Sequence, residues 1–405
     1  MKNYLKNFEN FPVNFLLFIL LAVFILQITI TMFYSNGIIT FSSKYGFYSL
    51  DRAAEFADSN FTLMRFDTNY KKEMNGFLYP FLLSIFYKIA GKTNMVSIIY
   101  VLSFVVFFII TAIFYKIAFD ILGKEVALLA TVVFVTAAPV ILAIYSGADV
   151  VMVFLLFALD IYFLYYNVER RDYTAAIIIS AILLICNFTS AIFGLVALTY
   201  IFYRFFGKKI KQNYYKVLIF VLFGFFIIVL IILSFVFVPN FSYENLQKLK
   251  IFEEKTFFVD TFFTDGFLWS KVFAPFLALF FYVGLFVKTY NEFKNKQITF
   301  NFFVLLLTIS ALLIEFFSTF SHETDTLFFI SPFYFIFILY ACYGVVYFAD
   351  LLLKNKVASR NLLFTGIFIF IILYNIIISF NKTIEQNNNI RFIINESYIQ
   401  KFLEK

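Results

Sequence analysis

Long apolar runs separated by short polar turns dominate the sequence. About eleven of these runs are predicted as membrane-spanning helices, because a bilayer core is crossed by roughly 20 apolar residues. We therefore predict an all-α polytopic membrane protein. The predicted spans are residues 13–34, 95–115, 125–146, 149–167, 173–188, 190–205, 216–238, 271–290, 299–318, 326–349 and 360–380.

A further apolar run, at residues 77–91, is shorter than the others and contains Pro80. Proline lacks the backbone N–H that a helix interior needs, so it interrupts helices. We therefore expect a juxtamembrane or re-entrant piece here and not an additional span.

Two longer polar segments interrupt the apolar pattern, at residues 35–94 and 239–270. The first should be helical, because residues 53, 56 and 57 are apolar at helical spacing while acidic residues 55 and 58 point elsewhere. No internal repeat or flexible linker divides the chain. We expect one membrane domain over residues 1–405, with a tail at 381–405 that is too short to fold separately.

The composition agrees with a membrane protein, since 62% of the residues are hydrophobic and 14% are charged, against about 25% charged in a soluble domain. The net charge of +7 is attributed to basic loops beside a membrane, not to nucleic-acid binding. The sequence has one histidine, which excludes a multi-histidine metal cluster. Its two cysteines both lie within apolar runs, which argues against a disulfide framework. We predict no metal site and no required cofactor, although the scattered carboxylates leave a divalent cation open.

Basic residues concentrate in alternate loops, which predicts the orientation of the chain. The short turns at 146–148, 187–189 and 318–325 contain no Lys or Arg. Cytoplasmic loops carry the excess of positive charge. The amino terminus should be cytoplasmic, in a plasma or inner membrane, with segments 35–94, 239–270 and the tail on the outer face. The basic loops assigned to the cytoplasm hold Arg170 and Arg171; Arg204, Lys208, Lys209, Lys211 and Lys216; Lys288, Lys294 and Lys296; and Lys354, Lys356 and Arg360.

Asp51 and Asp149 follow the first and third predicted spans, so both should lie at the outer surface. This placement of two carboxylates suggests chemistry at the membrane face. In contrast, Asp120, Asp160 and Asp350 fall near cytoplasmic ends of predicted helices, and we expect them at the interface with water.

Several short motifs resemble those of the GT-C glycosyltransferases, especially the aminoarabinose transferase and protein O-mannosyltransferase branches. Leu50-Asp51-Arg52 and Phe77-Leu78-Tyr79-Pro80 resemble the first periplasmic loop of that family. Ala138-Pro139 followed by Ser146–Asp149 is similar to its connection between the third and fourth helices. The stretch from His322 to Pro332 resembles its late segment.

The resemblance implies an inverting transfer of a sugar from a polyprenyl-phosphate donor to a lipid, glycan or protein acceptor on the outer face. Asp51 would take or orient the proton of the acceptor. Asp149 would orient the partners of Asp51 or bind the acceptor. The leaving phosphate is already ionised and needs cationic stabilisation. The donor-phosphate candidates are Arg52, Arg65, Lys71 and Lys72, and the substrate-binding candidates are Glu73, Tyr79 and His322.

Other interpretations stay open. Asp51 and Asp149 precede helical runs and could be helix N-caps, and the basic residues could meet anionic lipid headgroups. A transporter or flippase of a lipid-linked or amphiphilic solute would place charges near mid-membrane on interrupted helices, whereas the helices predicted here are largely uninterrupted. Asp325-Thr326 stands where the family has Arg-Tyr, which leaves open a non-catalytic GT-C-like subunit as a third interpretation.

Overall fold

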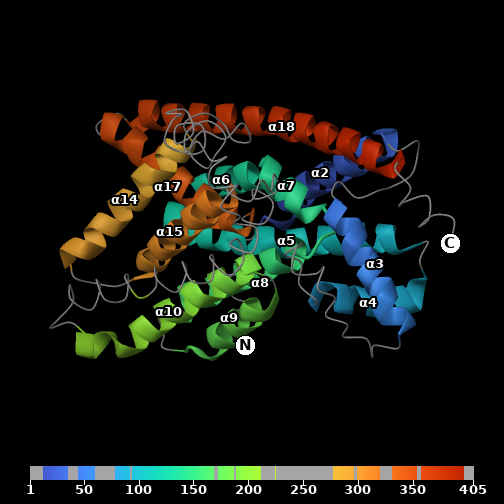
Figure 1. Ribbon diagram of the computed structural model, residues 1–405. Helices are drawn as coiled ribbons and strands as arrows, with labels where there is room; N and C mark the ends of the chain where they lie inside the picture. Colours follow the sequence, from blue (N-terminus) through green and yellow to red (C-terminus); the bar gives the residue numbers. More distant parts are fainter. Residues whose placement is uncertain are drawn as a thin grey trace, which may run out of the picture. The chain divides into compact units, whose positions relative to one another are not determined.

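The computed structural model is helical throughout the part of the chain it describes, with no strand in that part (Figure 1). The chain divides into two compact units, unit 1 (Met1–Ala158 and Phe368–Lys405) and unit 2 (Leu159–Ile367). The described residues are 12–34, 44–59, 78–91, 94–167, 172–186, 188–210, 224, 277–295, 299–319, 331–353 and 357–395.

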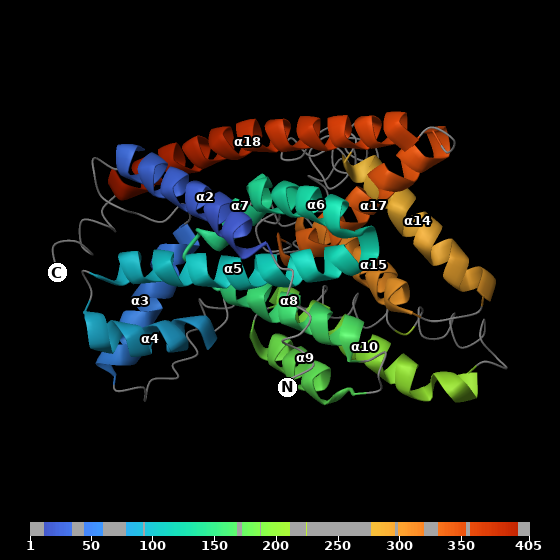
Figure 2. The same ribbon diagram turned by 180° about the vertical axis from the view of Figure 1, so that it is seen from behind.

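Unit 1 is built around the long helix α5, which packs against α2 and α6. A helical hairpin of α3 and α4 lies beside it, and both views show these two short helices together (Figures 1 and 2). The helices of unit 1 are α2 (Val13–Tyr34), α3 (Lys44–Asp58), α4 (Leu78–Ala90), α5 (Met95–Leu122), α6 (Lys124–Thr136), α7 (Ala138–Ile144), the start of α8 (Val150–Tyr166) and the end of α18 (Val357–Asn395).

Unit 2 contains two helix pairs, α9 with α10 and α14 with α17, and α15 contacts both α10 and α14. Its helices are the end of α8, α9 (Thr174–Cys186), α10 (Phe188–Ile210), α14 (Leu277–Asn295), α15 (Phe300–Thr319), the short 3₁₀ helix η7 (Ser331–Phe333), α17 (Tyr334–Leu353) and the start of α18.

Five helices of the described part are long and apolar enough to cross a membrane, or six if one bent pair counts as a span. The polytopic membrane class is therefore supported, whereas the number of eleven is not. Four predicted spans form helices with shorter apolar stretches, α8, α9, α14 and α15, and the predicted span 216–238 lies outside the described residues except for residue 224. The five spans are Val13–Phe33, Met95–Leu122, Thr189–Phe206, Ser331–Leu353 and Val357–Glu385.

Helix α4 confirms that the run at 77–91 is too short to span. Its 13 residues rise about 20 Å, short of the roughly 30 Å of a bilayer core. Pro80, however, does not interrupt the helix as predicted. It occupies the third position of α4, within the first turn, where a missing N–H removes no helical hydrogen bond.

The predicted span 125–146 is broken, because α6 and α7 meet at an angle of 60°. A continuous helix would need an N–H from Pro139 and would press its ring on the Val135 carbonyl. The chain instead becomes extended at Ala137 and restarts as α7 with the proline in its first turn. The prediction of largely uninterrupted helices is wrong at this position.

Side chains of α18 satisfy carbonyl groups that the break releases. Asn375 Nδ2 donates to the Val133 carbonyl at 3.3 Å, and Ser379 Oγ donates to the Thr136 carbonyl at 2.6 Å. One turn further, Thr383 accepts a hydrogen bond from Gln27 of α2 at 3.2 Å. The three α18 residues recur every four positions, so they form a polar stripe on one face of this otherwise apolar helix. Unpaired carbonyls in an apolar interior are costly, and this stripe therefore stabilises the broken helix.

Helix α18 continues to Asn395, well beyond the predicted span at 360–380. Much of the predicted tail is therefore a continuation of the last helix. Thr383 lies in this continuation and is fully buried, so packing within unit 1 extends the helix past the end of the apolar run.

Candidate functional site

Helix α3 confirms the predicted amphipathic helix of the first polar segment. Ala53 and Ala57 are buried, whereas Glu55 and Asp58 are exposed. The small alanine side chains allow α3 to pack along α4, and the Phe56 ring meets the Phe81 ring of α4 edge-on at 6.1 Å. Helices α3 and α4 therefore form a packed pair.

Asp51 lies in the middle of α3, which begins at Lys44, so the N-cap interpretation is wrong for this residue. It is half-buried. Burial raises the pKa of the Tyr87 hydroxyl, and the negative charges of Asp58 and then Asp51 raise it further. A carboxylate in mid-helix gains nothing from capping, so its position needs another explanation.

Arg52, the neighbour of Asp51, forms an ion pair with Glu55 at 3.3 Å, one turn further along α3. Its side chain is 26% exposed. The pair is local to the helix surface, where such interactions contribute little to stability. The guanidinium can therefore exchange this partner for an anionic ligand.

Asp149 directly precedes α8, and its carbonyl accepts hydrogen bonds from the N–H groups of Met152 and Val153 at 3.0 and 3.1 Å. Its position is thus the N-cap, as one interpretation of the sequence held. The residue is nevertheless only 3% exposed. A carboxylate at this end of α8 is favoured by the partial positive charge of the helix N-terminus.

The turn before Asp149 fixes where the carboxylate lies. Gly147 has a φ of +71°, a left-handed conformation that glycine adopts without strain. Ser146 Oγ donates to the Ala143 carbonyl at 2.7 Å and accepts from the Ala148 N–H at 3.1 Å. These bonds connect the end of α7 to the start of α8 in a tight, buried corner.

The negative charge of Asp149 acts on Tyr79, although 70 residues separate the two in the chain. Burial raises the pKa of the Tyr79 hydroxyl, and the negative charge of Asp149 raises it further. Tyr79 stands in the first turn of α4 and Tyr87 stands eight residues later, about 12 Å along the helix axis. Asp149 therefore acts at one end of α4, and Asp51 acts near the other.

An aromatic cluster packs behind this corner, which the sequence analysis did not identify. Tyr145 is 1% exposed and its ring stacks on Tyr100 at 5.9 Å. Phe24 and Phe107 pack on the same ring at 6.1 and 6.2 Å. Tyr145 directly precedes the Ser146–Asp149 motif, so its position could have been noticed in the sequence, whereas its partners come from distant helices.

Five candidate residues, Arg65, Lys71, Lys72, Glu73 and His322, lie outside the described residues. Asp51, Asp149, Arg52 and Tyr79 are the candidates that the structure places. In this part of the chain no three His, Cys, Asp or Glu side chains form a group that could hold a metal ion.

The three aspartates expected at the cytoplasmic interface differ from one another. Asp120 is exposed and pairs with Lys116 at 3.2 Å. Asp350 is partly exposed and pairs with Arg360 at 3.0 Å.

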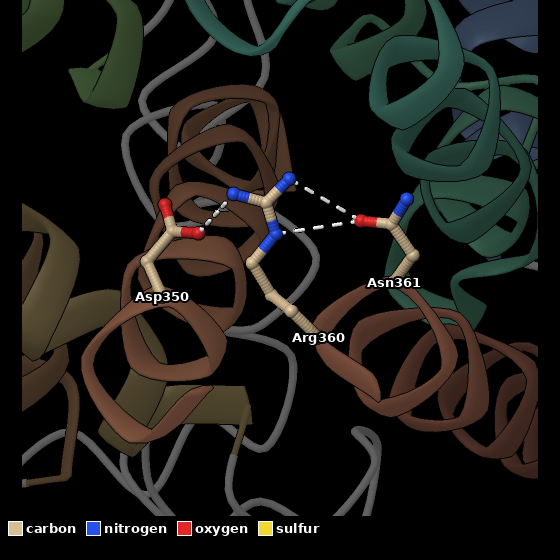
Figure 3. Close-up of polar contacts among 3 residues, drawn as sticks. All are labelled: Asp350, Arg360 and Asn361. Atoms are coloured by element: carbon tan, nitrogen blue, oxygen red, sulfur yellow. Dashed lines mark hydrogen bonds and ion pairs between the residues drawn. The ribbon is translucent and has the colours of Figure 1, made fainter. Parts of the chain in front are cut away.

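Figure 3 shows how Arg360 connects the end of α17 to the start of α18. Its guanidinium donates to Asp350 on one side and to the Asn361 side chain on the other.

Asp160, the third of these aspartates, is buried, because it is only 1% exposed. The interfacial prediction is wrong for this residue, since its side of α8 meets α9.

Comparisons with known proteins give no family. No protein-family model matches the chain, and no curated protein matches it either. The functional interpretation therefore depends on the residues and on their placement.

Proposed function

We propose that the chain is an integral-membrane glycosyltransferase that moves a sugar from a polyprenyl-phosphate donor to a lipid, glycan or protein acceptor at the outer face of the membrane. The observation that carries the proposal is the position of α4. The charge of Asp149 acts on Tyr79 in the first turn of this short helix, and the charge of Asp51 acts on Tyr87 near its other end. Helix α4 thereby links the two motifs that resemble GT-C enzymes.

In the proposed mechanism Asp51 accepts or orients the proton of the acceptor hydroxyl or amine. Its carboxylate is half-buried and held on a packed helix, so its orientation is restricted. Tyr79 stays protonated beside Asp149 and can donate its O–H to a substrate oxygen. Such a neutral donor next to a carboxylate suits recognition of sugar hydroxyls.

The leaving polyprenyl phosphate departs as an anion and needs no general acid. Arg52 is the described cation nearest to Asp51 in the chain, and its exposed pairing with Glu55 can be replaced by a phosphate. Guanidinium groups bind phosphate through paired hydrogen bonds. Arg65, Lys71 and Lys72 are the further candidates for this role.

The test compares two isosteric substitutions on the same helix. Asp51→Asn removes the proposed proton acceptor, and Asp58→Asn is the matched control because Asp58 is exposed and acts on the same Tyr87. Release of polyprenyl phosphate is measured on purified protein in nanodiscs, with a panel of radiolabelled polyprenyl-phosphate hexoses and aminopentoses as donors and with a cell-envelope extract that supplies lipid, glycan and protein acceptors.

We expect Asp51→Asn to lose about 10²–10⁴-fold in turnover, the usual contribution of a general base. Asp58→Asn should retain near wild-type turnover. Equal activity in the two variants would remove Asp51 from the mechanism. A wild-type protein that turns over no donor of the panel would reject the proposal.

A second candidate function is transport of a lipid-linked or amphiphilic solute. The 60° break between α6 and α7 favours it, because transporters bind substrates at interrupted helices. Proteoliposomes containing fluorescent polyprenyl phosphate distinguish the two functions. A transporter would move the lipid across the bilayer and leave it chemically unchanged, whereas a transferase requires a product.

A further inference from the structure

Asp160 is a buried acid that the proposed transfer does not use. It lies in the part of α8 that belongs to unit 2, and it is 1% exposed. Ser180 of α9, which is fully buried, is within hydrogen-bond distance of both carboxyl oxygens, at 3.1 and 3.2 Å. Helix α10 packs closely on α9 at this position, because a Cβ on its Gly194 would lie only 2.5 Å from the Ser180 carbonyl oxygen.

No cation balances a charge on Asp160 in the described part of the chain. Ion pairs in that part join Arg52 to Glu55, Lys116 to Asp120, Arg360 to Asp350 and Lys382 to Glu385, and none of these four includes Asp160. A carboxylate buried without a counter-ion is strongly unfavourable. The surroundings therefore favour the neutral acid.

Titratable groups on the neighbouring helices do not change this conclusion. Those whose side chains the structure describes are Tyr162, Tyr165 and Tyr166 of α8, Cys186 of α9, and Tyr200, Tyr203 and Arg204 of α10. Among the described side chains, Ser180 is the group that hydrogen-bonds to Asp160.

The number of hydrogens on Ser180 leads to the same assignment. A serine hydroxyl has one hydrogen to donate. Its shortest contact is with the Ala176 carbonyl at 2.7 Å, the usual acceptor for a serine inside a helix. The Ser180 oxygen then presents lone pairs to Asp160, and a neutral carboxyl group fills the 3.1 Å gap with its own O–H. Asp160 thus donates a hydrogen bond to Ser180, and Ser180 donates one to the Ala176 carbonyl.

We propose that Asp160 is a proton-binding site inside the helix bundle. The carboxyl group keeps its proton at neutral pH and donates a hydrogen bond to Ser180. This hydrogen bond joins α8 to α9. The bound species is a proton and not a metal ion, because two carboxyl oxygens and one hydroxyl fall short of the six or more oxygens that Ca²⁺ or Mg²⁺ requires.

Infrared spectroscopy of the protein in nanodiscs tests this site directly. The C=O stretch of a protonated carboxyl group is separate from that of a carboxylate. The difference between wild type and Asp160→Asn should show the loss of one protonated band at neutral pH. The matched control is Asp120→Asn, an exposed acid paired with Lys116, whose spectrum should keep the band.

Asp160→Asn should also fold normally, because the amide N–H₂ can donate to Ser180 as the neutral acid does. Exposure of the buried cysteines to a thiol-reactive dye measures this folding. A difference spectrum without the band would show that the ionised carboxylate is the native form and would overturn the proposal. A variant that fails to fold would contradict the expectation that an amide can replace a neutral acid at this position.

Discussion

The contact between α14 and α17 allows a sharp test of the fold. Both helices place a glycine at their crossing, and the Gly284 and Gly344 backbones approach the partner helix directly. A Cβ at Gly344 would lie 2.7 Å from the carbonyl carbon of Phe280. Carbon atoms in van der Waals contact are about 3.5–4.0 Å apart, so Gly344→Ala must separate the two helices by roughly 1 Å.

Overpacking of this kind typically costs about 1–3 kcal/mol. For a unit of about 200 residues, 1 kcal/mol shifts the melting temperature by about 2–4 °C, so we expect a fall of about 2–12 °C. The matched control is Gly366→Ala in α18, where a Cβ would meet no atom within 4 Å. Alanine is the better helix former by about 1 kcal/mol, so this control should melt at or slightly above the wild-type temperature.

Cys186 and Cys342 are buried and are not joined in a disulfide, so a dye that fluoresces on reaction with thiols reports unfolding without any added label. The protein is heated in detergent, and the midpoint of dye reaction is compared among the three proteins. An unchanged midpoint for Gly344→Ala would refute the close approach of α14 and α17.

The remaining predictions concern the α18 stripe, the hairpin and the orientation. Ser379→Ala leaves a released α6 carbonyl without its donor and should destabilise the protein by about 1–3 kcal/mol in the same melting assay. Asp51→Asn should lower the pKa of Tyr87 toward its ordinary value of about 10, measured by NMR titration of ¹³C-labelled tyrosine. An unchanged titration would show that the charge of Asp51 does not act on Tyr87. Because the folded state holds this proton more tightly than the unfolded chain, hairpin stability should fall as the pH rises from about 10 toward the raised value. Ser59→Cys should react with an impermeant thiol reagent from outside intact cells, and Asp172→Cys only after the cells are opened. Reaction of both from the same side would contradict the predicted orientation.

The sequence determined the helical class and the position of most helices. An apolar run must satisfy its own backbone hydrogen bonds in a membrane, so it becomes a helix whatever its neighbours are. The run predicted at residues 13–34 is helix α2 with those bounds. The amphipathic α3 was also predictable, because the spacing of Ala53, Phe56 and Ala57 defines a face from local information alone.

Tertiary packing decided the features that carry the functional argument. Helical periodicity shows which residues share a face, but not which helix covers that face. The surroundings of Asp160 became clear only when α9 placed Ser180 against it, and the effect of Asp149 on Tyr79 depends on how α4 and α8 are arranged. The break at Pro139 had a local signal, yet a kink in an apolar interior persists only when its released carbonyls find donors. Those donors come from Asn375 and Ser379, more than 240 residues away in the chain.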